Sequence, residues 1–176
     1  ITQSHVVFYA RPQVPDNGFK KQCYRSLNPN TRLSVLTYRP STINAMISLT
    51  TQEIRVSAES IYQHEYSVPN KRQYVYAYRI QIGNEGNVPV QLLSRTWEVI
   101  DGTGNRRVVE GEGVVGQQPV IMPGQFHEYT SWVQFETPIG AMCGSYIMQR
   151  MDRFKEGTSF EVEVPKFMHV APEMLN

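Results

Sequence analysis

The stretch from Tyr74 to Ile82 alternates large apolar side chains with smaller or polar ones. Successive side chains of a β-strand point to opposite faces, so this pattern places the tyrosines and isoleucines on one face of a half-buried strand. From Ile54 onward, similar short runs are separated by clusters of Gly, Pro and Asn, and no ten-residue stretch has a helical period. The sequence therefore restricts this region to an all-β fold.

Turn signals recur about every ten residues, a spacing that is typical of antiparallel β-sandwiches. Two short strands are expected between Ile54 and Tyr66, and another follows the turn Asp101–Asn105. Further strands are predicted at residues 74–82, 90–100, 126–136, 142–150 and 160–164. We expect an antiparallel β-sandwich of about seven or eight strands, of the immunoglobulin or fibronectin type III kind. The chain lacks the Cys…Trp…Cys spacing of true immunoglobulin domains.

Three glycines, Gly111, Gly113 and Gly116, match the G-x-G-x-x-G pattern of a dinucleotide-binding turn. That turn needs a helix directly after it, and Pro119 and Pro123 forbid one here. The glycines therefore favour positive-φ bends between strands. A second interpretation stays open, because successive backbone amides can hold a phosphate without a helix. Nearby arginines favour an anion there, and nearby glutamates oppose it: Arg106, Arg107, Glu110 and Glu112.

Composition and motif spacing give no signal of a membrane span or of a catalytic, metal or cofactor site. Of the 176 residues, 40% are apolar, which is enough for one core, and no apolar run is long enough to span a bilayer. The two cysteines are too few for a disulfide framework, which favours a reducing intracellular compartment. The histidines have no nucleophile or metal-ligand partner at motif spacing: His5, His64, His127 and His169. We therefore expect no enzyme, no cofactor, no metal and no small-molecule substrate.

Charge divides the chain into an N-terminal arm, residues 1–53, and a domain, residues 54–176. The arm has six basic and two acidic side chains, a net charge of +4, and the remainder has −3. Cations interspersed with aromatic residues suit RNA, because phosphates meet the cations and unpaired bases stack on the rings. The alternative is a solvated extension over the sandwich. The candidate RNA contacts are Arg11, Lys20, Lys21, Arg25, Arg32 and Arg39.

Two further side chains carry expectations. Arg95 and Trp97 are two residues apart and share a face with Leu93 and Val99, so we expect Arg95 to pack beside the indole. Cys143, between apolar neighbours, is expected to be a small buried hydrophobe.

Six motifs follow one another within residues 54–176: Tyr76-Ala-Tyr78, Ile80-Gln-Ile-Gly-Asn84, Pro89–Trp97, Glu110–Gly116, Glu136–Gly140 and Val164–Phe167. In this order they resemble the ApaG family. The resemblance implies a fibronectin type III-like fold and a binding module with no established catalytic activity. Similar domains occur in F-box substrate adaptors and in a polymerase-delta-interacting protein, and a nucleotide or pyrophosphate role has been suggested for the glycine loop. The chain departs from the family at Trp132, where a small residue is usual.

These observations lead us to expect a structural subunit of a larger assembly, with a mitochondrial ribonucleoprotein such as the ribosome favoured. The arm would contact RNA or protein, and strand edges and the loops 101–105 and 121–125 would dock protein neighbours. The mitochondrial matrix is the favoured location, with cytoplasm and nucleus as alternatives. Two other functions stay open: a substrate-recognition adaptor for a ubiquitin ligase or protease, and a nucleotide or pyrophosphate sensor.

Overall fold

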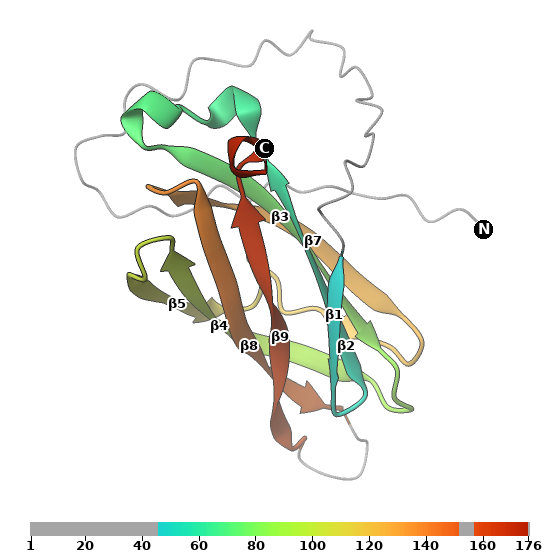
Figure 1. Ribbon diagram of the computed structural model, residues 1–176. Coiled ribbons are helices and arrows are strands. Elements are labelled where there is room, and N and C mark those ends of the chain that lie inside the picture. The colour runs from blue at the N-terminus through green and yellow to red at the C-terminus, as the bar shows by residue number, and fades with distance from the viewer. Residues whose placement is uncertain (1–45, 152–156, 176) are drawn as a thin grey trace, which may run out of the picture.

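The computed structural model describes residues 46–151 and 157–175, which form two antiparallel β-sheets packed face to face (Figure 1). The first sheet has the order β1 (Ile47–Thr51), β2 (Ile54–Tyr62), β3 (Tyr74–Asn84), β7 (Phe126–Phe135). The second has the order β5 (Arg106–Glu112), β4 (Val90–Asp101), β8 (Ile139–Arg150), β9 (Ser159–Val170), with the short β6 (Val120–Ile121) also paired to β4. The expected all-β antiparallel sandwich is confirmed.

Helical structure in the described residues is limited to short 3-10 turns. These are η1 (His64–Tyr66), η2 (Pro69–Lys71) and η3 (Pro172–Met174). None is long and apolar enough to cross a membrane. The six candidate RNA-contacting side chains of the arm all lie outside the described residues, so their role stays a prediction.

The region 54–66 forms one strand rather than the two that we expected. β2 pairs with β3 without interruption from Ile54 opposite Asn84 to Tyr62 opposite Tyr76, and η1 follows. The last strand is longer than predicted because β9 continues past Pro165 to Val170. The register of β8 and β9 shifts there, and an edge strand with a bulge tolerates a proline, which cannot donate to a ladder.

The first sheet begins before Ile54. β1 lies within the segment that charge assigned to the arm, and it pairs with β2 through the hairpin at Gln52 and Glu53. Both turn residues have positive φ, 49° and 67°, as in a type I′ turn. Asn-Gly is the usual sequence for such a turn, so Gln-Glu gave no signal of the hairpin.

A β-bulge in β4 changes the face that the sequence predicted. The register with β8 shifts between Leu92 and Ser94, so Leu92 is buried and Leu93 is not. Trp97 and Val99 remain on the buried face, as expected.

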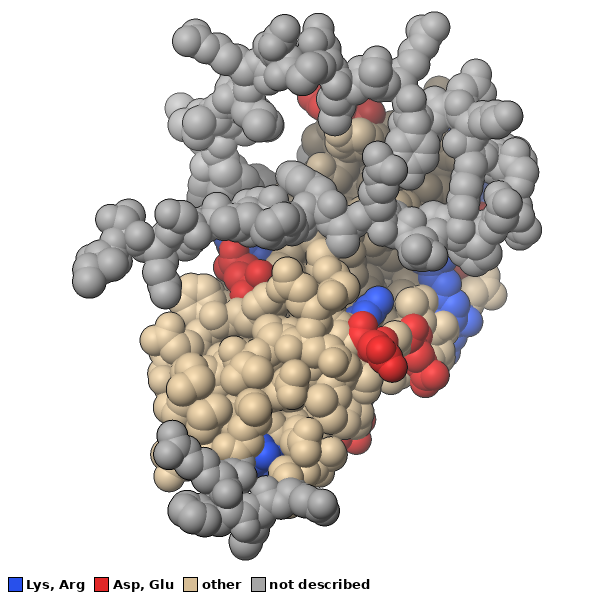
Figure 2. All heavy atoms as spheres, turned by 180° about the vertical axis from the view of Figure 1, so that it is seen from behind, with Lys and Arg blue, Asp and Glu red and all other residues tan. Residues whose placement is uncertain are grey.

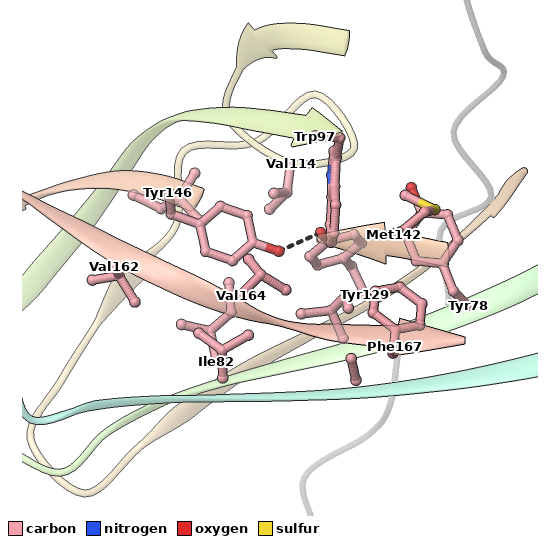
Figure 3. Packing of buried hydrophobic residues seen from close by; sticks show 14 of the residues in the cluster. Tyr78, Ile82, Trp97, Val114, Tyr129, Met142, Tyr146, Val162, Val164 and Phe167 are labelled. Atoms are coloured by element: carbon pink, nitrogen blue, oxygen red, sulfur yellow. Dashed lines mark hydrogen bonds between the residues drawn. The ribbon is translucent and has the colours of Figure 1, made fainter. Parts of the chain in front are cut away.

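The core between the sheets is rich in aromatic rings (Figure 3). Trp97 makes edge contacts with Tyr78 and Phe167 at centroid distances of 5.7 and 6.0 Å. The buried hydroxyls of Tyr129 and Tyr146 lie 2.7 Å apart, so each satisfies the other. Burial strongly favours the neutral phenols and raises the pKa of both tyrosines. Each fully buried large side chain contributes about 1.5–3 kcal/mol to folding.

Candidate docking surface

The glycine loop between β5 and β6 is a tight hairpin. Val114 and Gln117 exchange two backbone hydrogen bonds of 2.8 and 3.0 Å, which leaves Val115 and Gly116 as the turn residues. Gly116 has φ +76° and Gly113 has φ +58°. A Cβ atom on Gly113 would stand 2.1 Å from the Gln117 carbonyl oxygen, so only glycine fits. Gly113 and Gly116 thus supply the positive-φ bends that we expected, whereas Gly111 lies within β5 and supplies none.

Arg95 fastens this loop from β4. Its Nη1 donates to the carbonyl oxygens of Glu112 at 3.1 Å and Gly113 at 2.6 Å. Gly111 leaves room for the guanidinium, because a Cβ there would approach Arg95 Nη1 to 3.1 Å. Arg95 therefore holds backbone carbonyls, a role that its spacing from Trp97 did not predict.

Two backbone amides of the loop already donate hydrogen bonds within the protein. Gly113 N donates to Leu93 O and Val114 N to Gln117 O, both at 2.8 Å. The neighbouring carboxylate of Glu112 is exposed. Phosphate binding by the loop is the alternative that stays open, with the remaining amides as its donors.

The segment from the loop to β7 has no charged side chain between Glu112 and Glu128. Its apolar residues Val120, Met122 and Phe126 are exposed, with 47%, 53% and 56% of their surface accessible. We call Val120, Met122 and Phe126, the exposed large apolar residues of this uncharged segment, the uncharged surface. The space-filling view shows that one side of the molecule has a broad area without Lys, Arg, Asp or Glu (Figure 2).

Asn84, at the end of β3, ties this surface to the sandwich. Its buried Nδ2 donates to the carbonyl oxygens of Val88 at 2.8 Å and Ile121 at 3.0 Å. Its backbone N donates to Gln125 O at 3.0 Å, and its carbonyl accepts from Gly124 N at 2.8 Å. Three of these four hydrogen bonds hold the turn that carries Met122, so its apolar side chain is presented on a fixed backbone.

The two loops that we expected to dock partners lie at opposite ends of β4. Ile121 pairs with Val90, the first residue of β4, whereas the turn 101–105 begins at its last residue. A strand of this length spans roughly 35–40 Å, so the loops belong to two separate surfaces. Asp101 orders its own turn by accepting hydrogen bonds from Thr103 and Asn105, which lower its pKa to about 2.

A hollow of about 240 Å³ lies between the ends of β5 and β7. Arg107, on β5, crosses it and donates from Nη2 to the Gln134 carbonyl oxygen at 3.2 Å. This bond joins the two sheets on the side where they end in the edge strands β5 and β7.

Comparison with known proteins decides the family. The ApaG domain model matches residues 64–150. Protein ApaG of Paramagnetospirillum magneticum is 41% identical over 127 residues, which is 72% of this chain and 95% of that protein. The chain belongs to the ApaG family. Protein ApaG of Escherichia coli O1:K1 / APEC is 40% identical over 121 residues, 69% of this chain and 94% of that protein.

The fold agrees with solved ApaG structures. The putative ApaA protein from Bordetella pertussis is 41% identical in sequence and superposes with a TM-score of 0.64, covering 68% of this chain and 94% of that one. These matches take in nearly the whole of each relative and about seven-tenths of this chain.

Within the ApaG domain, the three described histidines differ in burial. His64 is exposed on η1, and His127 is half-buried on β7, where burial lowers its pKa. His169 is fully buried among aromatic rings, with Nδ1 2.7 Å from Ser60 Oγ and Nε2 without a hydrogen-bond partner. Burial lowers the pKa of His169 to about 3, so the ring is neutral near pH 7. His5 lies outside the described residues.

No group of three or more His, Cys, Asp or Glu side chains in residues 46–151 and 157–175 is placed to hold a metal ion. Cys143 is half-buried rather than buried as we expected, because its side chain lies on the outer face of β8. Its Sγ lies 3.5 Å from Glu98 Oε2. Burial and this carboxylate raise the pKa of the thiol, which therefore stays protonated and weakly nucleophilic near neutral pH.

Trp132, the family departure noted in the sequence, lies on the edge strand β7 opposite Ala77 of β3. It is 46% exposed. Sequence reasoning singled out the loops and Trp132, whose docking role stays a prediction, but it missed Asn84 and Arg95 as the residues that position the backbone around the loops.

Proposed function

We propose that this ApaG-domain chain is a non-enzymatic protein-interaction module that docks a protein neighbour on the uncharged surface. The observation that carries the proposal is the exposure of Val120, Met122 and Phe126 beside a turn that Asn84 holds in place. Exposed apolar side chains on a rigid scaffold gain contact area on binding while losing little backbone entropy. The absence of charges from 113 to 127 removes the desolvation cost that buried charges would add.

In this proposal the chain is a subunit of a mitochondrial ribonucleoprotein in the matrix, such as the ribosome. Support comes from the sequence of the arm, which has a net charge of +4 over residues 1–53 and aromatic residues between its cations. Such an arm neutralises phosphates and stacks on unpaired bases. The sandwich then contacts protein, and the arm contacts RNA.

The test compares two exposed methionines in the tagged full-length chain. Met122 is 53% exposed on the uncharged surface, and Met168 is 51% exposed on β9. We expect Met122→Asp to reduce co-sedimentation with the assembly, because a carboxylate would be desolvated at the contact. Met168→Asp introduces the same charge at the same exposure and should leave co-sedimentation unchanged.

Ribonuclease treatment of the same native extracts tests the identity of the assembly. An RNase-sensitive peak rich in ribosomal or RNA-processing proteins is the expected result. A small RNase-resistant complex with ligase or protease subunits would make the chain a substrate adaptor instead. Equal losses for Met122→Asp and Met168→Asp would remove the uncharged surface as the docking site.

A further inference from the structure

β5 is an edge strand whose outer side is open. Among the described residues, it pairs only with β4, and all of its residues except Gly111 are exposed. Val108 and Val109 in its centre are 62% and 43% accessible. Such an edge offers free backbone donors and acceptors to another strand.

Charge on β5 is separated by sign along the strand, which reads Arg-Arg-Val-Val-Glu-Gly-Glu from Arg106 to Glu112. Arg106 is 65% exposed and reaches Glu98 Oε1 at 2.6 Å. Within the described part of the chain, the carboxylates of Glu110 and Glu112 have no ion-pair partner. Charged residues whose only role is to prevent an edge strand from pairing with another chain can all have the same sign, and lysines are common in that role. A strand with cations at one end and anions at the other is complementary to its own antiparallel copy.

We propose that β5 pairs antiparallel with β5 of a second copy of this chain, across a two-fold axis midway between the two copies of Val109. A two-fold axis perpendicular to the sheet keeps every side chain on its own face, so it must lie between two copies of the same residue. At Val109, this axis sets Arg106 opposite Glu112 of the other copy, twice by symmetry. Both residues lie on the outer face of the sheet, together with Val108 and Glu110.

Contacts on the inner face of the sheet make this pairing weaker than the outer face alone would. Arg107 of one copy comes opposite Gly111 of the other, which has no side chain to clash. The Arg95 guanidinium already lies beside Gly111, so two cations approach each other there. The pairing is therefore weak, with a dissociation constant of about 10–100 µM for such a small interface. It is independent of the partner proposed for the uncharged surface.

Charge reversal of the full-length chain tests the register. Sedimentation velocity from about 1 to about 500 µM measures the monomer–dimer equilibrium. We expect Arg106→Glu and Glu112→Arg each to weaken dimerisation about tenfold, because each replaces two cross-strand attractions by two repulsions. Mixing the two variants should give a heterodimer, since both facing pairs are then Glu opposite Arg. The double variant R106E/E112R should recover dimerisation.

Two variants with the same charge changes serve as controls. Arg55→Glu removes an exposed arginine that pairs with Glu85 at 3.4 Å, as Arg106 pairs with Glu98, and Glu161→Arg alters an exposed residue of β9. Both should leave dimerisation unchanged, and so should Met122→Asp. A chain that stays monomeric throughout the range overturns the proposal. So does a dimer that Arg106→Glu weakens no more than Arg55→Glu, or a mixture of Arg106→Glu and Glu112→Arg that fails to associate.

Discussion

Protonation of His169 is expected to destabilise the fold as the pH falls. The folded-state pKa is about 3, because burial disfavours the charged ring, and the unfolded-state pKa is about 6.5. Below pH 6.5, the unfolded chain binds a proton that the folded chain does not. The free energy of unfolding therefore falls with pH by up to about 1.4 kcal/mol per pH unit, until the folded state is protonated near pH 3.

The magnitude follows from these two pKa values. Between pH 7 and pH 5, His169 alone lowers the free energy of unfolding by roughly 2 kcal/mol. The folded state also becomes less stable in acid because the carboxylates of Asp101 and Glu98, whose pKa values are lowered, become protonated. Their contribution is common to wild type and variant, so the difference between the two pH profiles isolates the histidine.

The double variant Ser60→Ala/His169→Phe removes the titrating ring together with its partner, so no hydroxyl is left unpaired. Urea unfolding, followed by the fluorescence of the buried Trp97, gives the free energy at each pH from 5 to 8. The loss of about 2 kcal/mol should disappear in this variant. Ser60→Ala alone keeps the buried ring and should retain the slope. Parallel profiles for wild type and the double variant would refute the reasoning.

The glycine hairpin carries the remaining predictions. Val115 has φ +51°, which is unfavourable for a β-branched residue, but its side chain packs partly against the core, so the two effects of Val115→Asn should nearly cancel and change the free energy of unfolding by less than about 1 kcal/mol in urea titrations. Gly113→Ala forces a contact with the Gln117 carbonyl and should lower the free energy of unfolding by about 2–4 kcal/mol. Gly104 also has positive φ, +89°, but open space around it, so Gly104→Ala should lower the free energy of unfolding by only about 1–2 kcal/mol. Similar losses for the two variants would contradict the steric argument. Calorimetric titration with ATP, ADP and pyrophosphate at millimolar concentration should give no heat of binding, because Gly113 and Val114 donate their amides internally, and saturable heat would favour the sensor function.

Alternation and turn composition predicted most of the fold because both are local consequences of a half-buried sheet. The strand from Tyr74 buries Tyr76, Tyr78, Ile80 and Ile82 on one face, as the pattern required. The site was less predictable. Asn84 and Arg95 act on backbone groups that are distant in sequence, and side-chain spacing alone gives no signal of such bonds.

The hairpin turns at Gln52-Glu53 and Val115-Gly116 show why the rest was hidden from the sequence. Both adopt two consecutive positive φ values, yet three of the four residues are not glycine. Local preference opposes these turns, so the register of the flanking strands must impose them: Thr51 faces Ile54, and Val114 bridges Gln117. Val114 is 1% exposed in the core, and its burial offsets the strain of the residue that follows it. A turn that packing stabilises against its own preference keeps one backbone conformation. The Arg95-bound loop and the Asn84-tied turn can therefore present the segment between them in a fixed shape to a partner.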